Sequence, residues 1–131
     1  MPKQILTSPR LGRPLGAYSQ ATMVPANGRL IFVSGLVARD AEGATVGPGD
    51  IRAQTRFILE SLKAILAEGG ASLADVVKVT VFIREMADFD AIHEVRREYF
   101  AQDPPASSMV QITSLVHPDY LIEIEAIAAA P

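Results

Sequence analysis

The sequence predicts an α+β fold in which two helices pack on one face of a mixed β-sheet. Residues 51–68 and 89–100 have apolar side chains at the spacing of an amphipathic helix. Residues 76–85 and 120–128 alternate like β-strands, and residues 29–38 contain an apolar run typical of a buried strand. We detect no internal repeat in the 131 residues, and the chain 1–131 is expected to form a single domain.

The N-terminal third is expected to contain an irregular segment followed by a β-hairpin. Residues 8–20 are rich in proline and glycine, which favours irregular chain on the surface. The strands 19–24 and 29–38 are separated by PANG, residues 25–28, whose proline, asparagine and glycine favour a tight turn. These features predict that the two strands pair with each other.

The first helix has clear signals at both ends. Asp50 precedes residue 51 and is placed to cap the helix, because its carboxylate can accept from free backbone N–H groups. Gly69 and Gly70 follow residue 68, where a glycine allows the left-handed turn that ends many helices. The helix is therefore expected to span residues 51–68.

The C-terminal half is expected to fold as strand, helix, strand and strand. The strand 76–85 should bury one face made of Val77, Val79, Val81 and Ile83. The helix 89–100, capped by Asp88, should bury Phe89, Ile92, Val95 and Tyr99. Residues 107–116 and 120–128 form the closing strands, which gives the order β-β-α-β-α-β-β.

A second copy of the chain is expected to cover the sheet. Residues 30–33 are apolar in succession, which is typical of a strand buried on both faces. Two helices can cover only one face of the sheet, and another copy is a simple cover for the other face. A homo-oligomer is therefore predicted from the pattern alone.

The composition argues against several classes of function. A net charge of −3 gives no general attraction to nucleic acid or acidic lipid. Without cysteine, disulfides and thiolate metal sites are excluded, and His93 and His117 lack metal-ligand spacing. The chain shows no phosphate loop, no run of about 18 apolar residues and no leader-like start, so a soluble, cytoplasmic protein without metal or cofactor is expected.

Two glutamates stand on one face of the last strand. Glu123 and Glu125 share that face with Leu121 and Ile127, while Ile122, Ile124, Ala126 and Ala128 face the core. One interpretation is a solvated face, with a glutamate paired to Lys78 of a neighbouring strand. The other is a carboxylate at a partly buried subunit boundary, where a raised proton affinity suits proton transfer.

Three further sites allow a structural and a functional interpretation. Ser34 and Gly35 end a buried strand, where glycine permits either close approach of a ligand or a simple kink or bulge. His93 is expected at the surface or at a boundary of the second helix. Arg96 and Arg97 are expected to form a solvated helix end.

Several segments together resemble the RidA/YjgF/YER057c/UK114 family. They are LGAYSQA, IFVSG, DVVKVTVFIREMADFDAIHEVRREYF, the PPAS turn and the closing IEIEAIA, and they cover nearly the whole chain in the family's order. The resemblance implies a chorismate-mutase-like fold, a homotrimer and ligand sites in clefts between subunits. It also implies a cofactor-free deaminase that hydrolyses enamines and imines, such as 2-aminoacrylate, to keto acids and ammonia.

The resemblance also assigns site residues. It implies that Glu123 is catalytic and manages water and protons, and that Tyr18, Ser34 and Gly35 bind the substrate, with the backbone N–H groups near Gly35 and Met109 assisting. Deaminating members carry an arginine that clamps the substrate carboxylate at the position of Ser107.

The second departure from the family pattern is His93, which stands where asparagine is common. A cationic His93 would be a partial replacement for the arginine charge that Ser107 lacks. Three functions stay open in this order: a deaminase-like hydrolase with altered substrate range, a trimer that binds a small metabolite without turnover, and an endoribonuclease or translation inhibitor.

Overall fold

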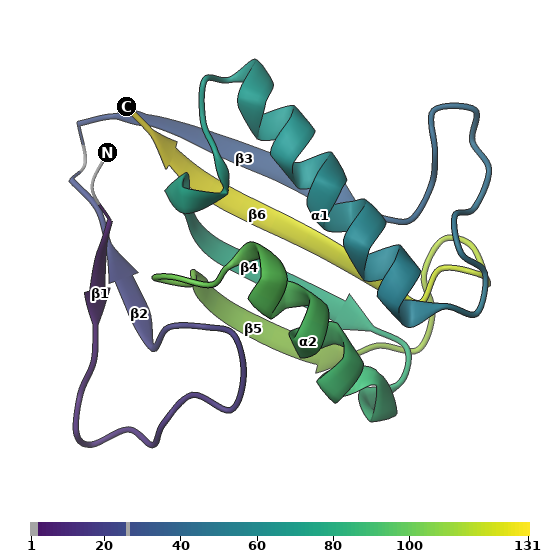
Figure 1. Ribbon diagram of the computed structural model, residues 1–131, viewed down its shortest axis with the longest axis horizontal. Coiled ribbons are helices and arrows are strands. Elements are labelled where there is room, and N and C mark those ends of the chain that lie inside the picture. The colour runs from purple at the N-terminus through teal and green to yellow at the C-terminus, as the bar shows by residue number, and fades with distance from the viewer. Residues whose placement is uncertain (1–2, 26) are drawn as a thin grey trace.

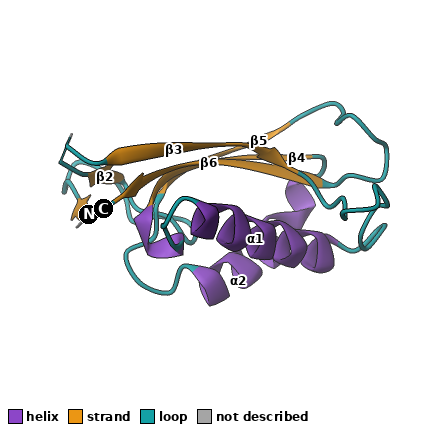
Figure 2. Cartoon of the chain, turned by 90° about the horizontal axis from the view of Figure 1, so that it is seen from above, coloured by secondary structure: helices purple, strands orange, loops and turns teal. Residues whose placement is uncertain are grey.

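Two helices cover one face of a four-stranded mixed sheet, which confirms the predicted α+β fold (Figures 1 and 2). The computed structural model describes residues 3–25 and 27–131. The sheet has the strand order β3-β6-β4-β5, with bounds β3 Arg29–Leu36, β4 Val76–Ile83, β5 Ala106–Gln111 and β6 Ile122–Ala130. The helices are α1 Ile51–Glu68 and α2 Phe89–Tyr99, and short 3₁₀ turns span Leu73–Asp75 and Met86–Asp88.

The expected hairpin between the second and third strands is wrong. The short strand β2, Ala21–Met23, pairs antiparallel with β1, Gln4–Leu6, which the sequence did not indicate. The strand β3 instead pairs antiparallel with β6 from the far end of the chain. The long apolar strand β6 offers β3 a far more extensive partner than three-residue β2 does, so tertiary packing overrides the local turn chemistry. Ala26 of the predicted turn lies outside the described residues.

Helix α1 begins and ends as predicted. The Asp50 carboxylate accepts a hydrogen bond from the Ala53 N–H at 3.0 Å, which satisfies one free donor of the first turn. At the other end Gly70 has φ +74°, and the Ala71 N–H donates to the Leu66 carbonyl at 3.0 Å. This is the left-handed closing turn that glycine makes possible.

We expect Asp50→Ala to lower the free energy of unfolding by about 1 kcal/mol, because the Ala53 N–H loses its side-chain acceptor. Asp88→Ala is the matched control. Asp88 was predicted to cap α2, but it lies in the preceding 3₁₀ turn and makes no side-chain capping bond. Urea unfolding of the two variants measures the difference, and equal losses would show that the Asp50 cap contributes nothing.

A bulge changes which side chains of β4 are buried. Val76 pairs with Ala128 and Lys78 pairs with Ile127, so one extra residue sits in β4 between these pairs. Val76 is therefore buried, and the predicted Val77 is only half-buried. The rest of the predicted face is correct, since Val79, Val81 and Ile83 all lie in the core.

The two faces of the sheet have different surroundings. The face under the helices forms the core, together with α1 side chains such as Leu62 and Leu66. The opposite face carries no helix (Figure 2), and Leu30 and Phe32 of β3 are 57% and 70% exposed. The apolar run 30–33 is thus buried on one face only within a single chain. Among the described residues, no helix is long and apolar enough to cross a membrane.

Candidate functional site

A cavity of about 210 Å³ lies between α2, β5 and the segment that joins β1 to β2. Four of the residues proposed from the sequence meet here: Tyr18, His93, Ser107 and Met109. The rest of the lining is Leu15, Phe89 and Arg96. The structure therefore brings together the part of the predicted site that comes from the first loop, the second helix and the fifth strand.

The segment 15–19 is attached to α2 and β5 by hydrogen bonds. The Ala17 N–H donates to His93 Nδ1 at 3.0 Å, and the Ala17 carbonyl accepts from Arg96 Nη2 at 3.3 Å. The Ser19 N–H donates to the Pro105 carbonyl at 3.0 Å, next to the first residue of β5. The segment is irregular, as the proline- and glycine-rich sequence of residues 8–20 predicts, but it forms a fixed wall of the cavity.

His93 is buried, with 2% of its surface exposed, so the surface or boundary position expected from the sequence is wrong. Burial lowers the pKa of His93 to about 4, and the nearby Arg96 and Arg97 charges lower it further in the same direction. Because Nδ1 accepts from Ala17, the neutral ring carries its hydrogen on Nε2. A cationic His93 that replaces an arginine charge is therefore also wrong at neutral pH.

Gly16 packs against the His93 ring so closely that a Cβ would overlap the imidazole. We expect Gly16→Ala to lower the free energy of unfolding by about 1–3 kcal/mol, because the buried ring has little room to move. Gly12→Ala is the matched control, since nothing lies within 4 Å of the added Cβ. Thermal unfolding of both variants tests this, and a Gly16→Ala protein as stable as Gly12→Ala would contradict the packing.

Arg96 is the residue that sequence reasoning missed. It was expected in a solvated helix end, but only 1% of its surface is exposed. Its Nη2 donates to the Ala17 carbonyl and, at 3.1 Å, to Ser107 Oγ. The helical period carried the signal, because position 96 lies four residues after the buried Ile92 and three after His93, on the same face of α2.

Glu123 lies on the other side of the sheet, over Gly35. The β3-β6 register shifts between Val33 and Leu36, so the expected bulge is present at Gly35. A Cβ on Gly35 would also overlap the Glu123 carboxylate, so the glycine makes room for this side chain. Burial raises the pKa of Glu123, and the neighbouring Glu125 charge raises it further. Lys78 does not pair with either glutamate, because its Nζ donates to Ser108 Oγ at 2.9 Å.

The register places the two halves of the predicted site on opposite faces of one sheet. Ser107 and Met109 pair with Val79 and Val81, whose side chains are buried under the helices. Glu123 instead pairs with Phe82, one residue out of phase, so its side chain points to the face without helices. Ser34 also lies apart, in a hollow of about 250 Å³ beside Glu125. One chain alone therefore does not assemble the whole predicted site.

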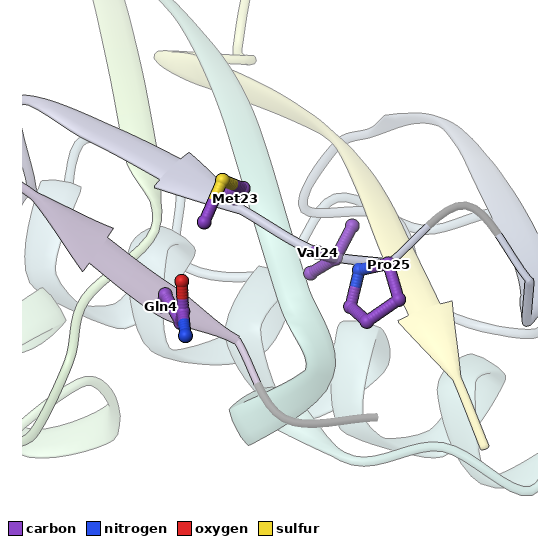
Figure 3. Close-up of a pocket in the computed structure, with 4 residues that line it drawn as sticks. All are labelled: Gln4, Met23, Val24 and Pro25. Atoms are coloured by element: carbon purple, nitrogen blue, oxygen red, sulfur yellow. The ribbon is translucent and has the colours of Figure 1, made fainter.

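Another hollow, of about 300 Å³, lies at the β1-β2 ribbon (Figure 3). It is lined by Gln4, Met23, Val24 and Pro25, of which only Gln4 has a polar side chain. None of these four described residues titrates or can act as a nucleophile. The cavity beside Arg96 is smaller, but it is lined by side chains that can form hydrogen bonds or carry charge, namely Tyr18, His93, Arg96 and Ser107.

Comparison with known proteins identifies the family. The model of the family described as Endoribonuclease L-PSP matches residues 9–130. The chain belongs to this family. A YjgF/YER057c/UK114 family protein of Mycobacterium tuberculosis has a similar structure, with a TM-score of 0.69 and 30% identity, and the match covers 98% of this chain and 100% of that one. The predicted resemblance to the RidA/YjgF/YER057c/UK114 family is confirmed.

Other relatives of this Endoribonuclease L-PSP family protein match over nearly their full length. A RutC family protein of Pyrococcus abyssi is 44% identical over 128 residues, and the 3-aminoacrylate deaminase RutC of Acinetobacter baylyi is 41% identical over 128 residues. Both matches cover 98% of this chain and 98% of the relative. The Rid family protein YyfB of Yersinia pestis has a TM-score of 0.89 at 32% identity, with 98% and 99% of the two chains covered.

Proposed function

We propose that this protein is an enamine/imine deaminase-like hydrolase that acts on small reactive imines, with Glu123 as its catalytic residue. The observation that carries the proposal is the Glu123 carboxylate, which lies over Gly35 with its pKa raised by burial. A raised pKa brings a carboxylate closer to the working pH, where it can both accept and return a proton. The 41% identical relative named 3-aminoacrylate deaminase supports the same reaction class.

The reaction needs a water molecule and one group that accepts and returns a proton. The water oxygen attacks the carbon of the protonated imine while the Glu123 carboxylate accepts a proton from the water, and the C=N electron pair moves to the nitrogen, which becomes a neutral amine. Glu123 then returns its proton to this nitrogen, the C–N bond breaks to release ammonia, and the hydroxyl gives its proton to the Glu123 carboxylate as it becomes the carbonyl. For an enamine, protonation of the β-carbon by the Glu123 carboxylic acid first yields the protonated imine and leaves Glu123 as the carboxylate. No metal or redox step is needed for this balance.

We further propose that the protein is a homotrimer whose sites lie in clefts between subunits. Two observations support this assembly. The face of the sheet without helices exposes Leu30 and Phe32, which a second subunit would bury. Glu123 lies on that face, whereas the cavity of Tyr18, His93, Ser107 and Met109 lies on the other. A neighbouring subunit can bring Glu123 of one chain to the cavity of the next.

Ser107 gives this site its own substrate range. A serine hydroxyl carries no charge, so it cannot replace the bidentate clamp that an arginine at this position would provide. Ser107 instead accepts a hydrogen bond from Arg96 and lines the cavity. We propose that the range is altered relative to members of the family that carry arginine here.

A metabolite-binding trimer without turnover is the second candidate, because the same cavity would serve it. The endoribonuclease activity in the family's description ranks last. The net charge is −3, and a small cavity with one arginine does not resemble the basic, aromatic surface that single-stranded RNA needs.

The test is ammonia release from imines generated in the assay by an amino-acid oxidase. The native protein should accelerate release above the spontaneous rate, and it should sediment as a trimer. Saturable ligand binding without acceleration would replace the hydrolase with the binding trimer. Salt-sensitive RNA binding with cleavage would overturn both.

A further inference from the structure

Arg96 presents an unsatisfied cationic group at the cavity. Its Nη2 donates to two neutral oxygens, the Ala17 carbonyl and Ser107 Oγ. Its Nη1 is buried and has no protein acceptor, and it is the one such side-chain atom among the described residues. Arg96 also lines the cavity of about 210 Å³. An unpaired N–H group on a buried guanidinium costs stability, so it favours an acceptor bound in the cavity, either water or a ligand.

The charge of Arg96 is not balanced by the protein. Within residues 3–25 and 27–131, no carboxylate forms an ion pair with it. Burial lowers the pKa of Arg96 to about 10, which still leaves the guanidinium charged at neutral pH. Arg96 lies in the last turn of α2, so the partial negative charge at that helix end is close to its guanidinium. This partial charge is smaller than the full charge of a carboxylate.

A purely structural role does not account for the charge. Arg96 helps to hold the segment 15–19 through the Ala17 carbonyl, but this contact uses only Nη2. A neutral donor such as a glutamine amide could serve the same carbonyl without burying a cation, whose desolvation is costly. The second amino group of the guanidinium, Nη1, has no acceptor in the protein, and Arg96 lines the cavity.

We propose that Arg96 of α2, in place of an arginine at position 107, binds the anionic group of the ligand, so that this chain holds that group from a different element of the fold. A ligand carboxylate would accept from Nη1 of Arg96. It would also accept from the Ser107 hydroxyl, which accepts from Nη2 and so has its own hydrogen to donate. That the ligand carries an imine or enamine follows only from the proposed function. That it carries an anionic group is inferred from Arg96 itself.

The remaining lining fits a small carboxylate with a short carbon skeleton. The Phe89 and His93 rings contact each other with centroids 4.3 Å apart and give the cavity an aromatic wall. The volume of about 210 Å³ is below the range of about 300–1,000 Å³ for drug-sized ligands. In this chain the cation is Arg96 of α2, and Ser107 of β5 accepts a hydrogen bond from it.

Binding of pyruvate and of its neutral amide, pyruvamide, to the native trimer tests the proposal by calorimetry, without any turnover. Pyruvate should bind at least tenfold more tightly than pyruvamide. Arg96→Gln keeps an amide donor but removes the charge, and it should lower pyruvate affinity at least tenfold while leaving pyruvamide affinity unchanged. Arg96→Lys should restore part of the difference. The matched control is Arg97→Gln, because Arg97 is the exposed neighbour on the same helix, and it should change neither affinity.

Equal affinities for the two probes in the native protein, or no binding of either at millimolar concentration, would overturn the proposal. So would a folded Arg96→Gln variant that binds pyruvate as the native protein does; circular dichroism and thermal unfolding establish that the variant is folded. The comparison of probes in the native protein needs no variant at all. Arg96-dependent pyruvate binding without ammonia release would leave the anion site standing and remove the hydrolase.

Discussion

Glu123→Gln should lower the rate of imine hydrolysis by about 10²- to 10⁴-fold, the usual contribution of a general acid–base group. Glutamine has nearly the same shape as glutamate, but it cannot accept a proton from water or return one to the leaving amine. Its amide can still lie over Gly35, so the proposed trimer should stay intact. Ammonia release from oxidase-generated imines measures the loss.

Glu125→Gln is the matched control for this change. Glu125 stands two residues along the same face of β6, is exposed, and lines the hollow that holds Ser34. It should cost little activity, apart from a small fall in the pKa of Glu123, whose ionisation Glu125 opposes. Equal losses in the two variants would show that general negative charge, rather than Glu123 itself, supports the reaction.

The pH dependence follows from the raised pKa of Glu123. The ionised carboxylate is the form that accepts a proton, so kcat/KM should rise with pH through a midpoint above the ordinary glutamate value. The folded state holds this proton more tightly than the unfolded state, so ionisation lowers stability as pH rises through the same range. Glu123→Gln should therefore be at least as stable as the native protein at neutral pH.

Two inactive variants should restore activity when they are co-expressed. Met109→Trp fills the cavity with an indole and leaves Glu123 on the opposite face of the sheet, while Glu123→Gln leaves the cavity intact. We suppose that each site joins the cavity of one subunit to Glu123 of the next. In randomly mixed trimers about a quarter of the clefts should then combine an intact cavity with an intact Glu123. Mixed trimers should show about that fraction of native ammonia release.

Each variant expressed alone provides the background for this experiment. A site contained in one chain would give mixtures no more active than the sum of the two variants, because every chain would carry one damaged half. Sedimentation of the mixture must show trimers, since dissociation would also prevent restoration. Restored activity in mixtures would establish that neighbouring subunits share the site.

The repeating patterns in the sequence predict the helices, three strands and most of the core. Helix α1 is predictable at both ends because the signals that set its bounds, Asp50 and Gly70, act within one turn of the chain. The face of β6 that carries Glu123 follows from strand alternation, which is equally local. The sequence indicated only that Gly35 could allow another group to approach its backbone. It could not indicate that this group is Glu123, because their contact depends on the β3-β6 register.

The sequence by itself therefore determined the two helices, most strands of the main sheet, the family and the residue types available for chemistry. Only the tertiary structure decided their partners: β3 paired with distant β6, a bulge moved burial from Val77 to Val76, and α2 packing buried His93 and Arg96. Periodicity shows that position 96 shares a face with Ile92, but a charged residue there normally predicts solvent. Burial of that charge depends on Ala17 and Ser107, which come from distant parts of the chain and meet Arg96 only in the folded protein.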